Sequence, residues 1–237
     1  MPVSATEAWL CGNRTIELAP ERPFLLGILN VTPDSFSDGG RFAGKAEAVW
    51  QGIRLLAEGD GVDVGGESTR PGAEPVSAKE ERARVIPVLK ELRKERPEAF
   101  LSVDTYKAEV AKAAIGEAGV DVINDVGAGR WDEGMISVIA GSRVGYVCMH
   151  AGGKPKEMQK NPTYRNVVSE VREFLQSRSE ELTVAGVERG RVLWDVGIGF
   201  GKTVEHNRAL LEADWSEAER PLLWGLSRKS FLEATKT

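Results

Sequence analysis

The sequence is poor in the residues from which several kinds of functional site are built. Its 237 residues include two cysteines, Cys11 and Cys148, which lie far apart and outside any metal-binding spacing. Two such thiols are typical of a reduced, cytosolic protein rather than of a disulfide scaffold. The two histidines, His150 and His206, are too few for a zinc site. No Ser/His/Asp order or activated-cysteine context indicates covalent catalysis.

Long apolar runs and an excess of positive charge are also missing. No segment is apolar over the length of a membrane-spanning helix, and the N-terminus lacks the basic start and apolar block of a signal peptide. The formal net charge of −5 gives no support to nucleic-acid binding. We therefore expect a cytoplasmic protein that binds small molecules, with no nucleic-acid or membrane partner. An anionic substrate would then need local positive charge or a metal.

What the sequence does contain is a regular alternation of two patterns. Short apolar or β-branched runs begin at residues 24, 61, 100, 120, 144, 192 and 222, and segments of helical periodicity lie between them. Strands that alternate with helices indicate a parallel sheet. Seven such units in a chain of this length predict an α/β fold of the (β/α)8 TIM-barrel type, with one domain over residues 1–237. We expect a hairpin over residues 7–20 at the floor of this barrel.

Unusual polar residues follow the candidate strands rather than precede them. Asp104, Asn124 and Asp195 end three of the strands, and Lys229 stands alone after the last one. Strand C-termini share the active-site rim of a TIM barrel, so these side chains should converge. Each Asp taken alone is more simply explained as a helix N-cap or a turn former. Together, the four groups suit a flat heterocycle that offers several N–H donors and a carbonyl.

Three connections at the same end are rich in glycine or hydroxyl groups. The first, NVTPDSFSDGG, holds six short polar side chains and one aromatic, Phe36. The second, GGESTRPG, holds a fixed cation, Arg70, although a mobile surface loop would have a similar composition. The third, VGIGFGKT, fails the phosphate-loop pattern because Val196 stands where a glycine is required. We expect its glycines to let the backbone pass close to a ligand, with Phe200 as a packing wall.

These motifs resemble those of the dihydropteroate synthase family, a group of pterin-binding TIM-barrel enzymes. GILNVTPDSFSDGG and DVGGESTRPGA are similar to its two signature segments, and SVDTYKAEV, INDV, CMH, GIGFGKTVEHN and GLSRKSF follow in the family's order. The resemblance covers residues 24–232. It implies a transferase of tetrahydrofolate biosynthesis. Such an enzyme condenses (7,8-dihydropterin-6-yl)methyl diphosphate with p-aminobenzoate, giving 7,8-dihydropteroate and pyrophosphate.

The resemblance also implies roles for individual residues. The implied pterin-binding residues are Asp104, Asn124, Met149, Asp195, Phe200, Gly225 and Lys229. The implied p-aminobenzoate-binding residues are Phe36, Thr69, Arg70, Pro71 and Ser230. Among these, Asp104, Lys229 and Arg70 would be catalytic, and Asn30 would help to hold Mg²⁺ on the pyrophosphate. A homodimer that is a sulfonamide target is a further expectation.

The sequence departs from the family pattern at two places. Many members read DPGFGFGK where this chain reads DVGIGFGK, but Val196 and Ile198 keep these positions apolar. Family members also continue with an eighth strand that carries an Arg-x-His motif, and nothing in this sequence matches it. We therefore expect the eighth β/α unit to be absent from the sequence. We expect the natural protein to extend beyond Thr237 by roughly 40 residues, enough for that unit.

Two other functions fit parts of the same pattern. A methyltetrahydrofolate-dependent methyltransferase on the same barrel could share the Asp and Asn residues that hold the pterin. It would not need the Phe36 loop, the STRPG segment or SRKS. A non-catalytic pterin-binding relative is compatible with the missing Arg-x-His motif, although the intact signature loops favour an enzyme.

Overall fold

The chain folds as a small hairpin followed by a curved parallel sheet. The computed structural model describes residues 7–32, 40–68 and 73–227, of which residues 40–43 are described by their backbone only. Strands β1 (Glu7–Cys11) and β2 (Arg14–Leu18) pair antiparallel, with Glu7 opposite Leu18. The parallel strands are β3 (Leu26–Asn30), β4 (Gly61–Gly65), β5 (Phe100–Asp104), β6 (Val122–Asp125), β7 (Gly145–Met149), β8 (Val192–Asp195) and β9 (Leu222–Leu223). Each of them pairs with the next in chain order.

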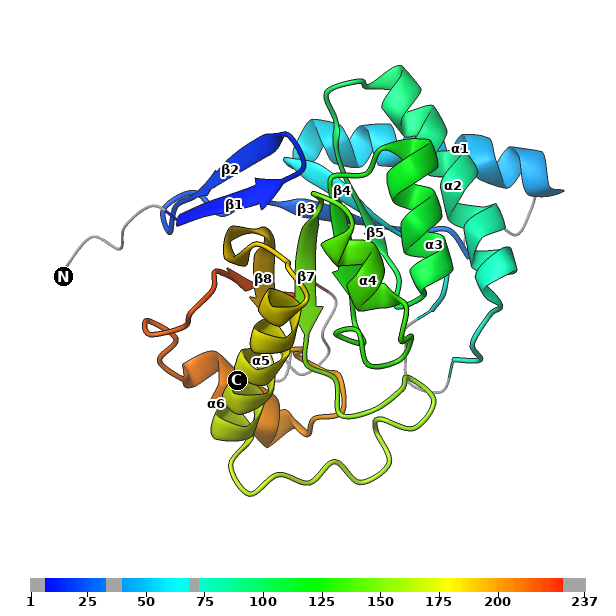
Figure 1. Ribbon diagram of the computed structural model, residues 1–237. Helices are drawn as coiled ribbons and strands as arrows, with labels where there is room; N and C mark the ends of the chain where they lie inside the picture. Colours follow the sequence, from blue (N-terminus) through cyan, green and yellow to red (C-terminus); the bar gives the residue numbers. More distant parts are fainter. Residues whose placement is uncertain (1–6, 33–39, 69–72, 228–237) are drawn as a thin grey trace.

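Helices connect the parallel strands and lie along the outer side of the sheet (Figure 1). They are α1 (Gly40–Glu58), α2 (Ala78–Glu95), α3 (Ala108–Ala113), α4 (Met135–Ala140), α5 (Val167–Val184) and α6 (Val204–Glu212). A π-helical turn, Ala114–Ala118, extends α3, and a short 3-10 turn, Arg189–Arg191, precedes β8. This is the predicted α/β fold of TIM-barrel type. The described residues supply seven parallel strands, and the absence of an eighth β/α unit from the chain stays a prediction.

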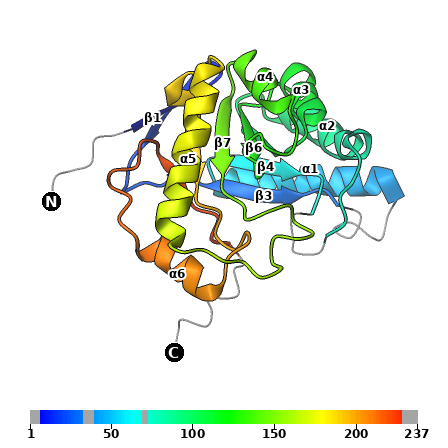
Figure 2. The same cartoon turned by 60° about the horizontal axis from the view of Figure 1, so that its bottom comes forward.

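Two apolar layers hold the sheet in place. The larger layer packs the outward side chains of the strands, such as Leu29 and Trp194, against helix residues such as Leu89 and Leu175. The smaller layer lies inside the curve of the sheet and is formed by Phe100, Val122, Val147 and Leu193, together with Trp9 and Cys11 of the hairpin. The indole Nε1 of Trp9 donates to the Arg191 carbonyl at 2.9 Å. The hairpin thus covers the amino-terminal ends of the neighbouring strands (Figure 2) and leaves their carboxyl ends for a site.

Polar side chains set where two of the helices begin. Ser77 Oγ accepts from the Glu80 amide at 3.2 Å and caps α2. Thr203 and His206 form a reciprocal capping box at the start of α6. His206 therefore has a structural role as a cap.

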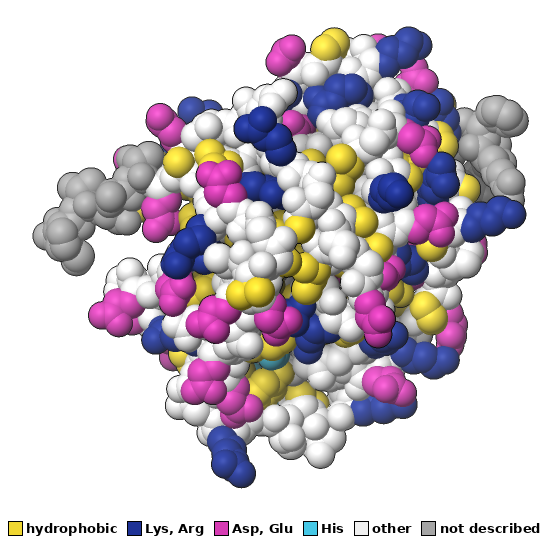
Figure 3. Space-filling view, viewed as in Figure 1, with side chains coloured by type: hydrophobic (Ala, Val, Ile, Leu, Met, Phe, Trp, Pro, Cys, Tyr) yellow, Lys and Arg dark blue, Asp and Glu magenta, His cyan; other side chains and the backbone are white. Residues whose placement is uncertain are grey.

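The face of the molecule drawn in Figure 3 carries both acidic and basic side chains, with more acidic ones at the lower left and more basic ones at the upper right. Apolar side chains show between them. Neither sign covers the whole face, which agrees with the modest net charge of −5.

Candidate active site

The carboxyl ends of the strands place the expected polar residues in register. Asn30, Gly65, Asp104 and Asn124 are successive pairing partners across β3, β4, β5 and β6. Residues from four distant parts of the sequence thus form one row along the rim of the sheet. We use "the rim" below for the carboxyl ends of strands β3 to β9.

Asn30 and Asp104 approach each other across Gly65. A Cβ atom at Gly65 would lie 3.6 Å from Asn30 Oδ1 and 3.6 Å from Asp104 Oδ2. Both side chains therefore flank the same glycine, and its missing side chain leaves room between them. Such a gap allows a ligand to reach the sheet edge.

Asp104 does not serve as a helix cap. The N-cap of the following helix, α3, is Lys107, which makes no side-chain capping bond. Asp125, one strand further on, shows what a structural carboxylate looks like in this fold. Its oxygens accept from the Gly127 and Gly129 amides and from the Tyr146 hydroxyl, each at 2.7 Å. Asp104 therefore does not cap the helix that follows it, and this favours a role in binding a ligand.

Asp63 is a site residue that the sequence analysis missed. It lies in the middle of β4 and is buried, and its Oδ2 accepts from Asn124 Nδ2 at 2.8 Å. The Ser102 hydroxyl lies opposite Asp63 on β5 and hydrogen-bonds to its carboxylate. Asn124 Oδ1 is buried with no hydrogen-bond partner among the described residues. Buried polar atoms without partners are uncommon and call for an explanation, and a ligand with an N–H donor would satisfy this oxygen.

Asp63 and its neighbour Asp104 both have raised pKa values. Burial raises the pKa of Asp63. Burial also raises the pKa of Asp104, and the charges of Asp63, Glu81, Asp125 and Glu67 raise it further. Strongly shifted carboxylates that lie together in a site are typical of functional positions. A donor-rich or cationic ligand would stabilise their charged forms.

A second part of the rim combines one carboxylate with an apolar wall. Asp195 pairs with Met149 in the sheet and is buried. Its Oδ1 accepts from the Gly197 amide at 2.7 Å, so Asp195 is in part the turn former that its position suggested. Its Oδ2 would lie 3.8 Å from a Cβ atom at Gly225. Asp195 and Gly225 are therefore neighbours.

Met149 belongs to a small apolar group at the rim, separate from the two main layers. Its buried members are Val126, Met149 and Ala151, and Tyr106, Trp131 and Phe200 pack against them. We call these six residues the rim apolar group. They can support one face of a flat ring, whose edge the carboxylates and the amide would then meet. Phe200 packs within this group, and its expected role as a wall beside a ligand stays a prediction.

Lys202 fixes the glycine-rich segment beside Asp195 and is not a phosphate-loop lysine. Its Nζ donates to the carbonyls of Gly197 at 2.9 Å, Phe200 at 3.1 Å and His150 at 3.2 Å, and lies 2.9 Å from His150 Nδ1. Burial and the Lys202 charge lower the pKa of His150 to about 3, so that imidazole stays neutral. The sequence analysis missed this role, and the only available signal was a lysine within a glycine-rich turn.

The remaining expected site residues lie outside the described part of the chain. They are Phe36, Thr69, Arg70, Pro71, Lys229 and Ser230. Their roles stay predictions, as do the individual roles of the residues described above. What the structure does bring together is Asn30 with Asp104, Asn124 with Asp63, and Asp195 with Met149 and Gly225.

The described residues do not form other common kinds of catalytic centre. Within residues 7–32, 40–68 and 73–227, no group of three or more His, Cys, Asp and Glu side chains could hold a metal ion. Both cysteines are buried thiols. Burial raises the pKa of Cys148 to about 12 and raises that of Cys11 as well, so neither is an activated nucleophile. No helix in the described part of the chain is long and apolar enough to span a membrane.

Comparison with known proteins shows relatives that match nearly the whole chain. The family model for pterin binding enzymes matches residues 26–237. Dihydropteroate synthase of Haemophilus influenzae is 42% identical over 226 residues, which cover 94% of this chain and 80% of the relative. Dihydropteroate synthase of Mycobacterium leprae is 43% identical over 224 residues, which cover 92% of this chain and 76% of the relative.

Solved structures agree with these sequence matches. Xanthomonas albilineans dihydropteroate synthase with 4-aminobenzoic acid superposes with a TM-score of 0.87 at 43% identity, covering 98% of this chain and 82% of that one. Burkholderia cenocepacia dihydropteroate synthase in complex with 7,8-dihydropteroate gives a TM-score of 0.83 at 41% identity. The match covers 98% of this chain and 80% of that one. These two structures therefore resemble this chain in sequence as well as in fold.

Proposed function

This chain belongs to the pterin-binding enzymes, within the dihydropteroate synthase family, and from that premise we propose how its described residues serve the reaction. The reaction joins the amine of p-aminobenzoate to the methylene of (7,8-dihydropterin-6-yl)methyl diphosphate. A C–N bond forms, the C–O bond to the diphosphate breaks, and the amine loses a proton. The products are 7,8-dihydropteroate and pyrophosphate. The observation that carries the assignment to this site is the row of carboxylate and amide groups at the rim, in which the buried Asn124 Oδ1 has no partner among the described residues.

The pterin ring is proposed to lie at the rim, against the rim apolar group. Asp195 would accept two parallel N–H groups from the amidine-like edge of the ring, because a carboxylate offers two oxygens. Asn124 would accept from one N–H with its unpartnered Oδ1 while Asp63 holds its Nδ2. Met149, Phe200 and Gly225 would line the slot, and Lys229 would donate to a ring nitrogen or carbonyl.

Asp104 is proposed to act on the reacting methylene. Loss of pyrophosphate leaves positive charge on the pterin methylene, and a nearby carboxylate stabilises that charge electrostatically. The neighbouring carboxylates, which raise the Asp104 pKa in the free site, make a cation at this position more favourable. No protein nucleophile is needed, which agrees with the buried, protonated thiols.

Mg²⁺ is proposed to bind with the diphosphate rather than in a resident metal site. Mg²⁺ keeps several waters and commonly takes one or two protein oxygens together with substrate phosphates. Asn30 offers one amide oxygen at the rim, next to Asp104, and fits this requirement. When bound, the ion would neutralise charge on the departing pyrophosphate. The described residues fit such a shared site, and they do not form a closed cage.

Further proposals rest on the family resemblance. Phe36, Thr69, Arg70, Pro71 and Ser230 would bind p-aminobenzoate, with Arg70 and Lys229 acting as catalytic residues. The enzyme would work in the cytoplasm as a homodimer. The Yersinia pestis dihydropteroate synthase has been solved in a sulfonamide complex, which supports this chain as a sulfonamide target.

A turnover assay tests the proposed reaction. The purified protein is incubated with Mg²⁺, p-aminobenzoate and the pterin diphosphate, and both products are quantified by mass spectrometry. We expect 7,8-dihydropteroate and pyrophosphate in equal amounts, and neither dihydropteroate nor excess pyrophosphate when p-aminobenzoate is left out. Binding of the pterin diphosphate without turnover would instead support a non-catalytic pterin-binding protein. Methyl transfer from methyltetrahydrofolate would support the methyltransferase.

A further inference from the structure

Three polar side chains on neighbouring strands form a short chain of hydrogen bonds that ends at the rim. Asp63 lies in the middle of β4, Ser102 lies opposite it on β5, and Asn124 lies on β6. Asp63 Oδ2 accepts from Asn124 Nδ2 at 2.8 Å, and the Ser102 hydroxyl also hydrogen-bonds to this carboxylate. Asp63 and Ser102 are both buried. We call these three residues the Asp63 cluster.

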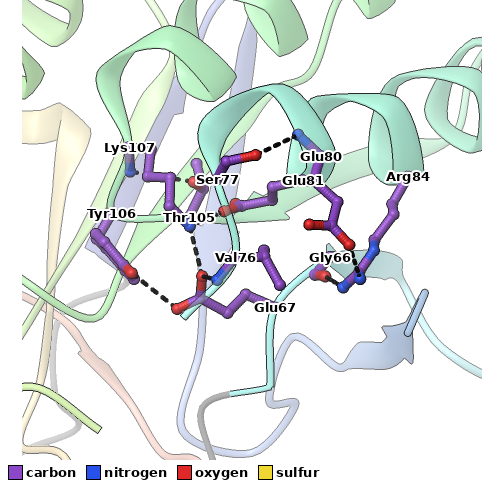
Figure 4. Close-up of polar contacts among 10 residues, drawn as sticks. All are labelled: Gly66, Glu67, Val76, Ser77, Glu80, Glu81, Arg84, Thr105, Tyr106 and Lys107. Carbon is purple, nitrogen blue, oxygen red and sulfur yellow. Dashed lines mark hydrogen bonds and ion pairs between the residues drawn. The ribbon is translucent and has the colours of Figure 1, made fainter. Parts of the chain in front are cut away.

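Other buried carboxylates beside the rim are held in a different way. Glu67 and Glu81 share the ammonium group of Lys107 (Figure 4). The Tyr106 hydroxyl donates to Glu67 as well, at 2.8 Å. Among the described residues no cation pairs with Asp63 in this manner, and its carboxylate accepts from two neutral side chains. Asp63 therefore orients neutral groups rather than compensating a buried positive charge.

The Asp63 carboxylate determines which way the Asn124 amide faces. A carboxylate offers acceptor oxygens only, whereas an amide has a donor end and an acceptor end. Turning the amide over would bring two acceptor oxygens together, so the donor end faces Asp63. Burial raises the pKa of Asp63, while the hydrogen bonds from Ser102 and Asn124 act in the opposite direction and favour the carboxylate. The buried Asn124 Oδ1 is thereby left to accept from a ligand.

The ring of the proposed substrate places its N–H donors on different edges. Its 2-amino group and N3–H form the amidine-like edge that is assigned above to Asp195. Asn124 lies on β6 and Asp195 on β8, with β7 between them, so the two side chains can meet different edges of a flat ring. The remaining ring N–H is at N8. It exists only in the 7,8-dihydro form, because N8 of an oxidised pterin is an acceptor without a hydrogen.

We propose that Asp63 is a positioning residue that makes the site select the 7,8-dihydro form of the pterin over the oxidised form. Asp63 does so by holding the Asn124 amide with its oxygen toward the N8–H group. An oxidised ring would instead set its N8 acceptor against the Asn124 oxygen. The inference rests on the proposed function and adds to it the oxidation state of the ring that the site accepts. Asp63 itself needs no contact with the substrate.

The test compares two ligands that differ in the oxidation state of the ring. They are (7,8-dihydropterin-6-yl)methyl diphosphate and (pterin-6-yl)methyl diphosphate, and each Kd is measured by calorimetry without oxygen and without p-aminobenzoate. We expect the wild type to bind the dihydro ring about tenfold or more tightly than the oxidised ring, because the latter leaves two acceptors facing each other.

Asp63→Ala removes the group that fixes the amide. The Asn124 amide can then turn over and donate to N8 of the oxidised ring, so we expect the preference to fall to about twofold or less. A role in stability alone would weaken the binding of both ligands by the same factor and leave their ratio unchanged. Asn124→Ala removes the selecting oxygen and should abolish the preference as well.

Asp121→Asn is the matched control. Asp121 is also buried and directly precedes β6, the strand of Asn124, but it lies at the opposite end of that strand, where it pairs with Arg14 and Arg93. This change should lower the free energy of unfolding and keep the wild-type ratio of the two Kd values.

Two results would overturn the inference. One is a wild-type preference below about threefold, less than one net hydrogen bond provides. The other is an undiminished preference in folded Asp63→Ala. Should Asp63→Ala fail to fold, Asp63→Leu fills the space without an acceptor and takes its place. An undiminished preference in Asn124→Ala overturns the inference whether or not the Asp63 variants fold. A wild-type protein that binds neither ring would overturn the proposed function itself.

Discussion

Asp104 is the site residue whose pKa is raised by the largest number of neighbouring carboxylates. It stands between Asn30 and Asn124 in the row along the rim, and four other carboxylates raise its pKa in addition to burial. Evolution toward stability alone would remove such a charge, since repulsion and lost hydration both destabilise the folded protein. Its presence is the kind of local destabilisation that active sites retain for function.

The raised pKa of Asp104 gives a prediction with a defined sign. The native state keeps the proton over a pH range in which the unfolded chain, with a carboxyl pKa of about 4, has lost it. The free energy of unfolding therefore falls as the pH rises from that value through the raised native pKa. Asp104→Asn removes this penalty. We expect it to raise the free energy of unfolding at pH 7.5 by about 1–3 kcal/mol and to raise Tm accordingly, while turnover is lost.

The pH dependence distinguishes this electrostatic cause from a change in packing. The stabilisation should shrink as the pH approaches 4, because the unfolded chain then begins to regain its proton and the two states differ less in protonation. Thermal unfolding of both proteins, followed by circular dichroism at pH 7.5 and at pH 4.5, measures the effect. A lower Tm for Asp104→Asn at pH 7.5, or a gain of equal size at both pH values, would contradict this account.

Single residues show where sequence reasoning reached its limit. Asp104, Asn124 and Asp195 could be singled out because each ends a strand, and strand ends of a parallel barrel share one rim. Asp63 lies inside the strand pattern GVDVGG and reads as part of a buried strand, although an Asp flanked by two valines was itself a signal. Lys202 donates to backbone carbonyls, and the Tyr106 hydroxyl donates to Glu67. These hydrogen bonds join residues that come together only in the folded chain, so no local sequence pattern could reveal them.

At the scale of elements, the segment from Val196 to Lys202 illustrates how backbone conformation shapes the site. Gly197 has a φ of +69°, and a Cβ atom there would lie 1.8 Å from the His150 carbonyl oxygen. Only glycine fits so close to another backbone segment. The same approach brings the His150 and Gly197 carbonyls to Lys202 Nζ, which satisfies both. The segment thereby supports Asp195, whose carboxylate accepts from the Gly197 amide.

Gly197→Ala should therefore be strongly destabilising. The new methyl group forces the two backbone segments apart and adds strain at a positive φ, so we expect a loss of about 2–4 kcal/mol in the free energy of unfolding. Gly116→Ala is the matched control, because Gly116 lies in the helical turn after α3 with nothing within 4 Å of its Cβ position. That change should be neutral or stabilising by up to about 1 kcal/mol. Urea denaturation measures both, and equal effects of the two substitutions would contradict the close-approach argument.

The element pattern itself was largely predictable, with an exception at the last strand. The apolar runs of β4 and β5 are buried on both faces, so they read clearly as strands. The last run, LLWGLS, forms only the two-residue strand Leu222–Leu223 in the structure. Among the described strands β9 pairs on one side only, with β8; β3 also has one partner and is five residues long, so the number of partners does not by itself set the length of β9.

At the scale of the whole molecule, the fold brings distant segments to one rim. The two ends of the parallel strands have different roles. The hairpin and the inner apolar layer occupy the amino-terminal ends of the strands, while polar groups collect at the carboxyl ends. The central claim is that this rim binds a pterin. It accounts for the family assignment, the unpartnered oxygen of Asn124, and the raised pKa values of Asp63 and Asp104.

Calorimetric titration of the pterin diphosphate into the wild-type protein and into Asp195→Asn tests this claim most directly. Asparagine keeps the size of the side chain but replaces one acceptor oxygen by a donor that opposes the ring N–H groups. We predict that it weakens binding by about 30-fold or more, as expected for a lost buried charged hydrogen bond. Asp214→Asn, at an exposed position between α6 and β9, should bind like the wild type. Equal affinity of Asp195→Asn and wild type, with both proteins folded, would contradict the proposed pterin site.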